Sequence, residues 1–121
     1  MGPILIVDDE FGIAEALTGF LEDEGYPSAF ALNGRLAMEQ MAKASPSLVF
    51  LDYMMPVMNG PAVLEAMKSD PNLRDVPVVL MSASPPKVWR DLPATDFLHK
   101  PFGLDQFLEL VRRNLGHPPA R

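Results

Sequence analysis

The chain has 121 residues, the size of a single domain, and hydrophobic residues make up 48% of them, enough for a buried core. The net charge of −6 argues against nucleic acid as a direct ligand, because phosphate backbones bind basic surfaces. There is no cysteine, which excludes disulfides and thiolate metal sites, and the N-terminal apolar run is too short for a signal peptide or a membrane span. These features predict a cytoplasmic domain that binds neither nucleic acid nor a membrane.

Five short apolar runs, mostly without polar alternation, are typical of strands that are buried on both faces of a sheet. Taken along the chain, they cover residues 4–7, 28–32, 48–51, 78–81 and 97–99.

Helical patterns fill most of the intervals between these strands. They cover residues 11–24 and 34–43, a segment from Gly60-Pro61 to just before Asp70-Pro71, and residues 104–115 with Gly116 as the stop. The side chains expected to face the core are Ile13, Ala14, Leu17, Phe20, Leu21, Leu36, Ala37, Met41, Val63, Leu64, Met67, Leu104, Phe107, Leu108, Val111 and Leu115.

The alternation of strands and helices predicts parallel pairing through right-handed crossovers. We expect a single α/β domain with an open, doubly wound sheet of five parallel strands in the order 2-1-3-4-5. Such sheets bind ligands at the carboxyl ends of their strands, where the strand order reverses between strands 1 and 3.

The interval between residues 83 and 96 breaks the rhythm. It contains Pro85, Pro86 and Pro93, which leave room for about two helical turns at most. We expect a shortened or irregular fourth helix here. Trp89 lies within it and is either a hydrophobic plug that replaces lost helix contacts or an exposed anchor for a partner.

Polar side chains follow four of the expected strands. Asp8 and Asp9 end the first strand, Asp52 the third, Ser82 the fourth and Lys100 the fifth. Because the carboxyl ends of parallel strands share one edge of a sheet, these groups can meet there. The sequence thus predicts a carboxylate site for a divalent cation and a phosphoryl group.

In this order, the residues resemble the receiver domain of two-component response regulators. The resemblance rests on Asp8-Asp9-Glu10, on Asp52-x-x-Met55-Pro56-x-Met58-Asn59-Gly60, on Ser82 and on Lys100-Pro101. It implies a flavodoxin-like receiver domain at residues 1–116, with a disordered tail or the start of a linker at residues 117–121. It also implies a signalling module rather than an enzyme, which receives a phosphoryl group from a histidine kinase or histidine phosphotransfer protein and acts on an unknown downstream protein.

The resemblance makes Asp52 the phosphoacceptor and Mg²⁺ the cofactor. The metal would be held by Asp9, Asp52 and the backbone carbonyl of Met54 directly, and by Asp8 through water. Alternatively, the acidic group caps the first helix, with Glu10 as the foremost candidate for that role.

The remaining roles also follow from the resemblance. Lys100 would offset charge on the phosphoryl group, Ser82 would hydrogen-bond it, and the Lys100–Pro101 peptide bond would be cis. Ser82 and Phe97 would form the switch, although Ser82 alone could satisfy backbone groups and Phe97 could simply pack in the core.

Two alternatives remain open. One is a small phosphatase of the haloacid-dehalogenase kind, although its nucleophile would follow the first strand in an Asp-x-Asp arrangement, whereas this chain has adjacent Asp8-Asp9. The other is a receiver-like interaction domain with lost or altered signalling, which the unusual segment 83–96 supports.

In the family, the positions of Met54 and Ser84 tune water access to the acyl phosphate.

Overall fold

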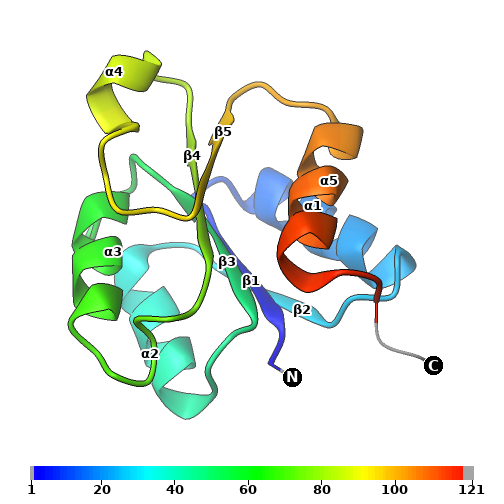
Figure 1. Cartoon of the computed structure of the whole chain (residues 1–121), viewed down its shortest axis with the longest axis horizontal. Coiled ribbons are helices and arrows are strands. Elements are labelled where there is room, and N and C mark those ends of the chain that lie inside the picture. The colour runs from blue at the N-terminus through cyan, green and yellow to red at the C-terminus, as the bar shows by residue number, and fades with distance from the viewer. Residues whose placement is uncertain (1, 119–121) are drawn as a thin grey trace.

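A computed structural model describes residues 2–118, which fold around one five-stranded parallel sheet (Figure 1). The strand order is β2-β1-β3-β4-β5, as the sequence predicts. The elements, in chain order, are β1 (Ile4–Val7), α1 (Phe11–Asp23), β2 (Ser28–Ala31), α2 (Gly34–Lys43), β3 (Leu48–Asp52), α3 (Gly60–Lys68), β4 (Val78–Ser82), α4 (Pro86–Trp89), β5 (Asp96–His99) and α5 (Leu104–Leu115).

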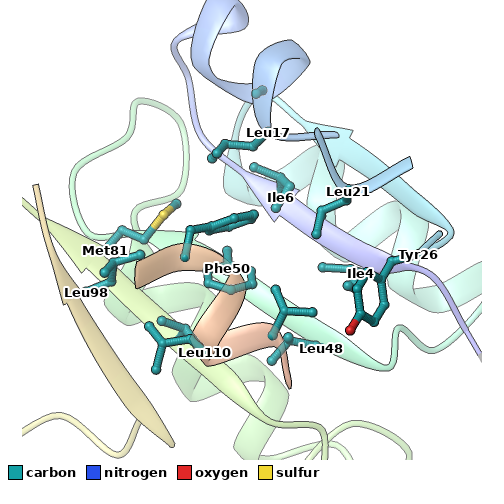
Figure 2. Packing of buried hydrophobic residues seen from close by; sticks show 14 residues of the cluster. Ile4, Ile6, Leu17, Leu21, Tyr26, Leu48, Phe50, Met81, Leu98 and Leu110 are labelled. Atoms are coloured by element: carbon teal, nitrogen blue, oxygen red, sulfur yellow. The ribbon is translucent and has the colours of Figure 1, made fainter. Parts of the chain in front are cut away.

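The central strands are buried over their whole length, which explains why their sequences lack polar alternation. Successive side chains point to opposite faces, so the sheet has two cores. Figure 1 shows α1 and α5 on one face and α2 and α3 on the other. Figure 2 shows the first core, where Ile6 and Phe50 of the sheet meet Leu17 of α1 and Leu110 of α5.

Most of the predicted inward-facing side chains are buried or packed against a core, but two are not. Leu36 is 38% exposed and Leu104 is 50% exposed. Both lie in the first turn of a helix, so helical spacing alone does not predict their burial. In α5 the sequence analysis missed Leu110, which is buried together with Phe107 and Val111.

The fourth helix is short, as predicted, and has only the four residues Pro86–Trp89. Trp89 is 2% exposed and packs on Phe97 with ring centroids 5.4 Å apart. The plug interpretation of this tryptophan is therefore confirmed, and the interpretation as an exposed partner anchor is wrong.

No helix within residues 2–118 is long and apolar enough to cross a bilayer. Of the tail expected at residues 117–121, residues 119–121 lie outside the described range, so the expectation of a disordered end stays a prediction.

Candidate functional site

The sheet register brings the candidate residues to one edge. Val7 pairs with Leu51, so the residues that follow them, Asp8 and Asp52, leave adjacent strands at the same level. Asp52 in turn pairs with Met81, whose neighbour Ser82 ends β4. Parallel pairing thus delivers side chains from distant parts of the sequence to the predicted position.

Three carboxylates meet at this edge. Asp8, Asp9 and Asp52 each offer an oxygen atom, and these atoms all lie within 4.8 Å of one another. Asp8 is completely buried and Asp52 is 6% exposed, whereas Asp9 faces solvent. The cluster is therefore open on one side, where a ligand can approach.

Lys100 supplies the positive charge of the site. Its Nζ lies 2.9 Å from Asp8 Oδ2 and 3.5 Å from Asp52 Oδ1. Its backbone N–H donates to the carbonyl of Ser82 at 2.8 Å, which ties the end of β5 to the end of β4. The Lys100–Pro101 peptide bond is cis, the form that the resemblance implies.

The electrostatics of the cluster are unfavourable for three ionised carboxylates. Burial, together with the negative charge of Asp8, raises the pKa of Asp52 to about 6, although Lys100 opposes the shift. Burial alone would lower the pKa of Lys100, but its hydrogen bond to Asp8 and the charge of Asp52 outweigh that effect and raise it. One ammonium leaves a negative excess, which favours a further cation.

The donor set fits Mg²⁺. Its octahedral shell, with oxygens at about 2.1 Å, brings neighbouring ligand atoms to about 3–4 Å from one another, which small side-chain rotations could achieve here. Both oxygens of Asp8 are already engaged, Oδ1 by the Glu10 backbone N–H at 3.0 Å and Oδ2 by Lys100. Asp9 and Asp52 therefore have the more available oxygens. A triad of this composition is typical of a Mg²⁺ site.

Glu10 lies where the sequence analysis expects an acidic cap, at the positive end of the dipole of α1. It occupies the N-cap position of α1, but its carboxylate makes no capping hydrogen bond. The preferred N-cap side chains are the shorter Ser, Thr, Asp and Asn, whose oxygen reaches the first free N–H groups without an additional methylene. Asp8, two residues earlier, bonds the Glu10 N–H instead.

Glycine makes room for the loop after Asp52. A Cβ atom on Gly60 would lie 2.4 Å from the Asp52 carbonyl oxygen, so only glycine fits there. Gly34, at the start of α2, is similarly close to the Met58 carbonyl and donates its N–H to it at 3.2 Å. Sequence reasoning missed Gly34, although its position after Asn33, a helix cap, was a usable signal.

The same loop contains a strained residue. Val57 has φ of 69°, a left-handed conformation that β-branched residues rarely adopt, and sequence reasoning did not anticipate it. Its side chain is 72% exposed, and that of Met54 is 68% exposed. The loop after Asp52 therefore exposes two apolar side chains.

Ser82 lies at the predicted edge and is 2% exposed. Its Oγ accepts the backbone N–H of Ser84 at 3.0 Å, so it does satisfy a backbone group. Phe97, three residues before Lys100, faces Trp89 in the core beneath α3 and is not among the residues of the acidic cluster.

Residues 4–112 match the family described as the response regulator receiver domain. The chain belongs to this family. This family consists of signalling receivers, which accept a phosphoryl group from histidine kinases or phosphotransferases, and the haloacid-dehalogenase alternative is thereby excluded.

Curated relatives agree with this assignment. The receiver domain is 36% identical to sporulation initiation phosphotransferase F of Bacillus subtilis, over 93% of this chain and 92% of that protein. It is 37% identical to the uncharacterized transcriptional regulatory protein YkoG of the same organism, over 94% of this chain and 51% of that protein. The chain spans about half the length of several curated relatives that it matches.

Solved structures agree as well. The receiver domain of a histidine kinase from Syntrophus aciditrophicus superposes with a TM-score of 0.86 at 37% identity, covering 95% of this chain and 90% of that chain. The response regulator TrrA of Thermotoga maritima, solved with Mg²⁺-BeF, superposes with a TM-score of 0.84 at 32% identity, covering 95% of this chain and all of that chain.

Proposed function

We propose that this receiver domain accepts a phosphoryl group on Asp52 from a histidine kinase or a histidine phosphotransfer protein, in a Mg²⁺-dependent reaction. Phosphorylation then switches a surface that binds a downstream protein. The supporting observation is the cluster itself, in which three carboxylates lie within 4.8 Å and the Lys100 ammonium lies 3.5 Å from Asp52. The proposed place of action is the cytoplasm, and the absence of cysteine agrees with a reducing compartment.

Asp52 is the nucleophile of the proposed reaction. One of its carboxylate oxygens attacks phosphorus of the partner's phosphohistidine and forms an acyl phosphate. The donor's N–P bond breaks, and the imidazole nitrogen keeps the bonding electron pair. The attacking group must be ionised, and a pKa of about 6 leaves most Asp52 side chains charged at neutral pH.

The three carboxylates have different roles in binding the cation. Asp9, Asp52 and the Met54 carbonyl would hold it directly, and Asp8 would hold it through water. The existing hydrogen bonds of both Asp8 oxygens support this division. Bound Mg²⁺ supplies positive charge that neutralises the carboxylates and the oxygens of the incoming phosphoryl group.

Lys100 and Ser82 respond to the new group. The ammonium of Lys100 turns toward the phosphoryl oxygens and the Ser82 hydroxyl donates to them, which adds two charge-assisted hydrogen bonds of about 1.5–3 kcal/mol each. Together they shift a two-state equilibrium by about two to four orders of magnitude. Phe97 is the proposed aromatic partner of Ser82 in this switch.

The test is phosphorylation by a small donor. Incubation with acetyl phosphate and Mg²⁺, followed by intact mass spectrometry, is expected to add one phosphoryl group to the wild type and none to Asp52→Asn. Asp91→Asn, at an exposed position in the loop after α4, is the matched control and should label like the wild type. A label that survives in Asp52→Asn would refute the assignment of the acceptor.

The shortened α4 favours one second candidate, a receiver-like interaction domain that no longer signals. An NMR titration with Mg²⁺ and then beryllofluoride separates the two functions. A signalling receiver responds to both additions, whereas the interaction domain responds to Mg²⁺ at most.

A further inference from the structure

We propose that Trp89 is a positioning residue for the phosphoryl transfer to Asp52. Its indole N–H acts through the main chain of Ser84 and sets the orientation of the Ser82 hydroxyl. This role rests on the proposed function, since Ser82 must donate to the phosphoryl group for its orientation to matter.

Two hydrogen bonds connect the indole to the hydroxyl. Trp89 Nε1–H donates to the Ser84 carbonyl at 2.8 Å, and the Ser84 backbone N–H donates to Ser82 Oγ at 3.0 Å. The carbonyl and the N–H belong to the two peptide planes that meet at the Ser84 Cα. Both planes are therefore held, and the turn between β4 and α4 has a defined geometry.

Trp89 is a firm attachment point for this turn. Its side chain contacts Phe97 and His99 of β5, with ring centroids 5.4 Å and 6.3 Å away. Helix α4 has four residues, too few to be stable alone, and its buried residue is Trp89. The indole thus ties α4 and the turn before it to the core.

The consequence for Ser82 concerns its hydrogen-bonding capacity. A hydroxyl has one donor hydrogen and two acceptor lone pairs, and the Ser84 N–H occupies one lone pair. Within residues 2–118, no hydrogen bond is recorded in which Ser82 Oγ is the donor, so its hydrogen is available for a phosphoryl oxygen. If the indole bond is lost, the Ser84 peptide planes can rotate and the hydroxyl loses its fixed orientation.

The experiment removes the indole N–H and keeps the ring. Trp89→Phe is the first variant, and the second replaces the single tryptophan of the chain by benzothienylalanine, whose ring has sulfur in place of N–H. Both should weaken beryllofluoride binding in the presence of Mg²⁺ about three- to tenfold, the value of one lost hydrogen bond. The affinity for Mg²⁺ alone should not change, because its proposed ligands lie on β1, β3 and the residues directly after them.

A double-mutant cycle distinguishes positioning from a general structural effect. In a Ser82→Ala background, Trp89→Phe should no longer alter beryllofluoride binding. Leu92→Ala is the matched control, because Leu92 packs in the same core but makes no bond to Ser84, and it should lower stability without altering beryllofluoride binding.

Two results would overturn the role of Trp89. One is unchanged beryllofluoride binding in both Trp89 variants. The other is that Trp89→Phe weakens beryllofluoride binding by the same factor in the wild-type and the Ser82→Ala backgrounds. A different result would refute the proposed function, and the role of Trp89 with it. In that case the wild type would bind Mg²⁺ but would neither bind beryllofluoride nor become phosphorylated by acetyl phosphate.

Discussion

Lys100 is paired more closely with Asp8 than with Asp52, since its ammonium lies 2.9 Å from the former carboxylate and 3.5 Å from the latter. Asp8 is fully buried, so this pair is shielded from solvent and geometrically constrained. In the cation-free domain the lysine is therefore the counter-ion of the cluster. Under the proposed function, it would share the carboxylates with Mg²⁺ and give up contacts to reach the phosphoryl group.

Replacing Lys100 should strengthen Mg²⁺ binding. In Lys100→Met the metal no longer meets a positive charge beside its ligands, so its affinity should rise about three- to tenfold, as Coulomb repulsion between nearby partly buried charges requires. Isothermal titration calorimetry measures the effect, and Lys87→Met, at an exposed position of α4, is the control expected to show none. Weaker Mg²⁺ binding by Lys100→Met would contradict the idea that the Lys100 ammonium competes with Mg²⁺ for the carboxylates.

Neutralising Asp52 should stabilise the metal-free protein. Burial raises the pKa of this carboxyl to about 6, so its charged form opposes folding. Asp52→Asn should raise the free energy of unfolding at pH 7 by about 1–3 kcal/mol, because each unit of pKa shift corresponds to about 1.4 kcal/mol. Urea denaturation measures the difference.

The pH dependence of that difference has a definite sign. The folded state holds the Asp52 proton more tightly than the unfolded state, whose carboxyl has a pKa of about 4. The free energy of unfolding of the wild type therefore falls as the pH rises from about 4 to about 6 and Asp52 ionises. Above pH 6 this loss of stability stays constant. The advantage of Asp52→Asn should vanish below pH 4 and shrink with saturating Mg²⁺; an equal advantage at every pH would refute this explanation.

Gly60→Ala should be strongly destabilising, by about 2 kcal/mol or more, because the new Cβ would lie 2.4 Å from the Asp52 carbonyl oxygen and the backbone would have to move. Gly19→Ala is a matched control in α1, where a Cβ meets nothing within 4 Å. That change should stabilise the protein by about 0.5–1 kcal/mol. Chemical denaturation of both variants tests the contrast, and equal effects would contradict it.

Met54 should influence the lifetime of the acyl phosphate. Its apolar, exposed side chain lies two residues after Asp52 and cannot orient a water molecule for hydrolysis. We expect Met54→Asn and Met54→Glu to dephosphorylate faster, as measured by loss of the label after the donor is removed. An unchanged rate in both variants would remove the hypothesis, and Val57→Asn, on the same loop, serves as the control.

The sheet and the meeting of the strand-end residues were predictable because they follow from local patterns and one topological rule. Continuous apolar runs predicted buried strands, and parallel order then required Asp8, Asp52 and Lys100 to share an edge. The short α4 followed from prolines, whose effect on a helix is local.

Features that depend on three-dimensional neighbours were not predictable. Periodicity assigns a face to Leu36 and Leu104 but does not reveal whether a neighbouring element covers each side chain. The choice of Lys100 between Asp8 and Asp52 depends on distances of a few tenths of an ångström. The left-handed Val57 has no sequence signal, since its residue type disfavours that conformation.

The anchoring of the β3–α3 loop by Gly34 and Gly60 bears on how fast a phosphodonor can dock. Because Met58 is bonded to the start of α2 and Gly60 packs against the Asp52 backbone, the rim around the acceptor is already formed before any encounter. Little ordering entropy is then lost on this side of the complex. We therefore expect the association rate with a phosphodonor to depend on diffusion, orientation and ionic strength rather than on a rearrangement of the receiver.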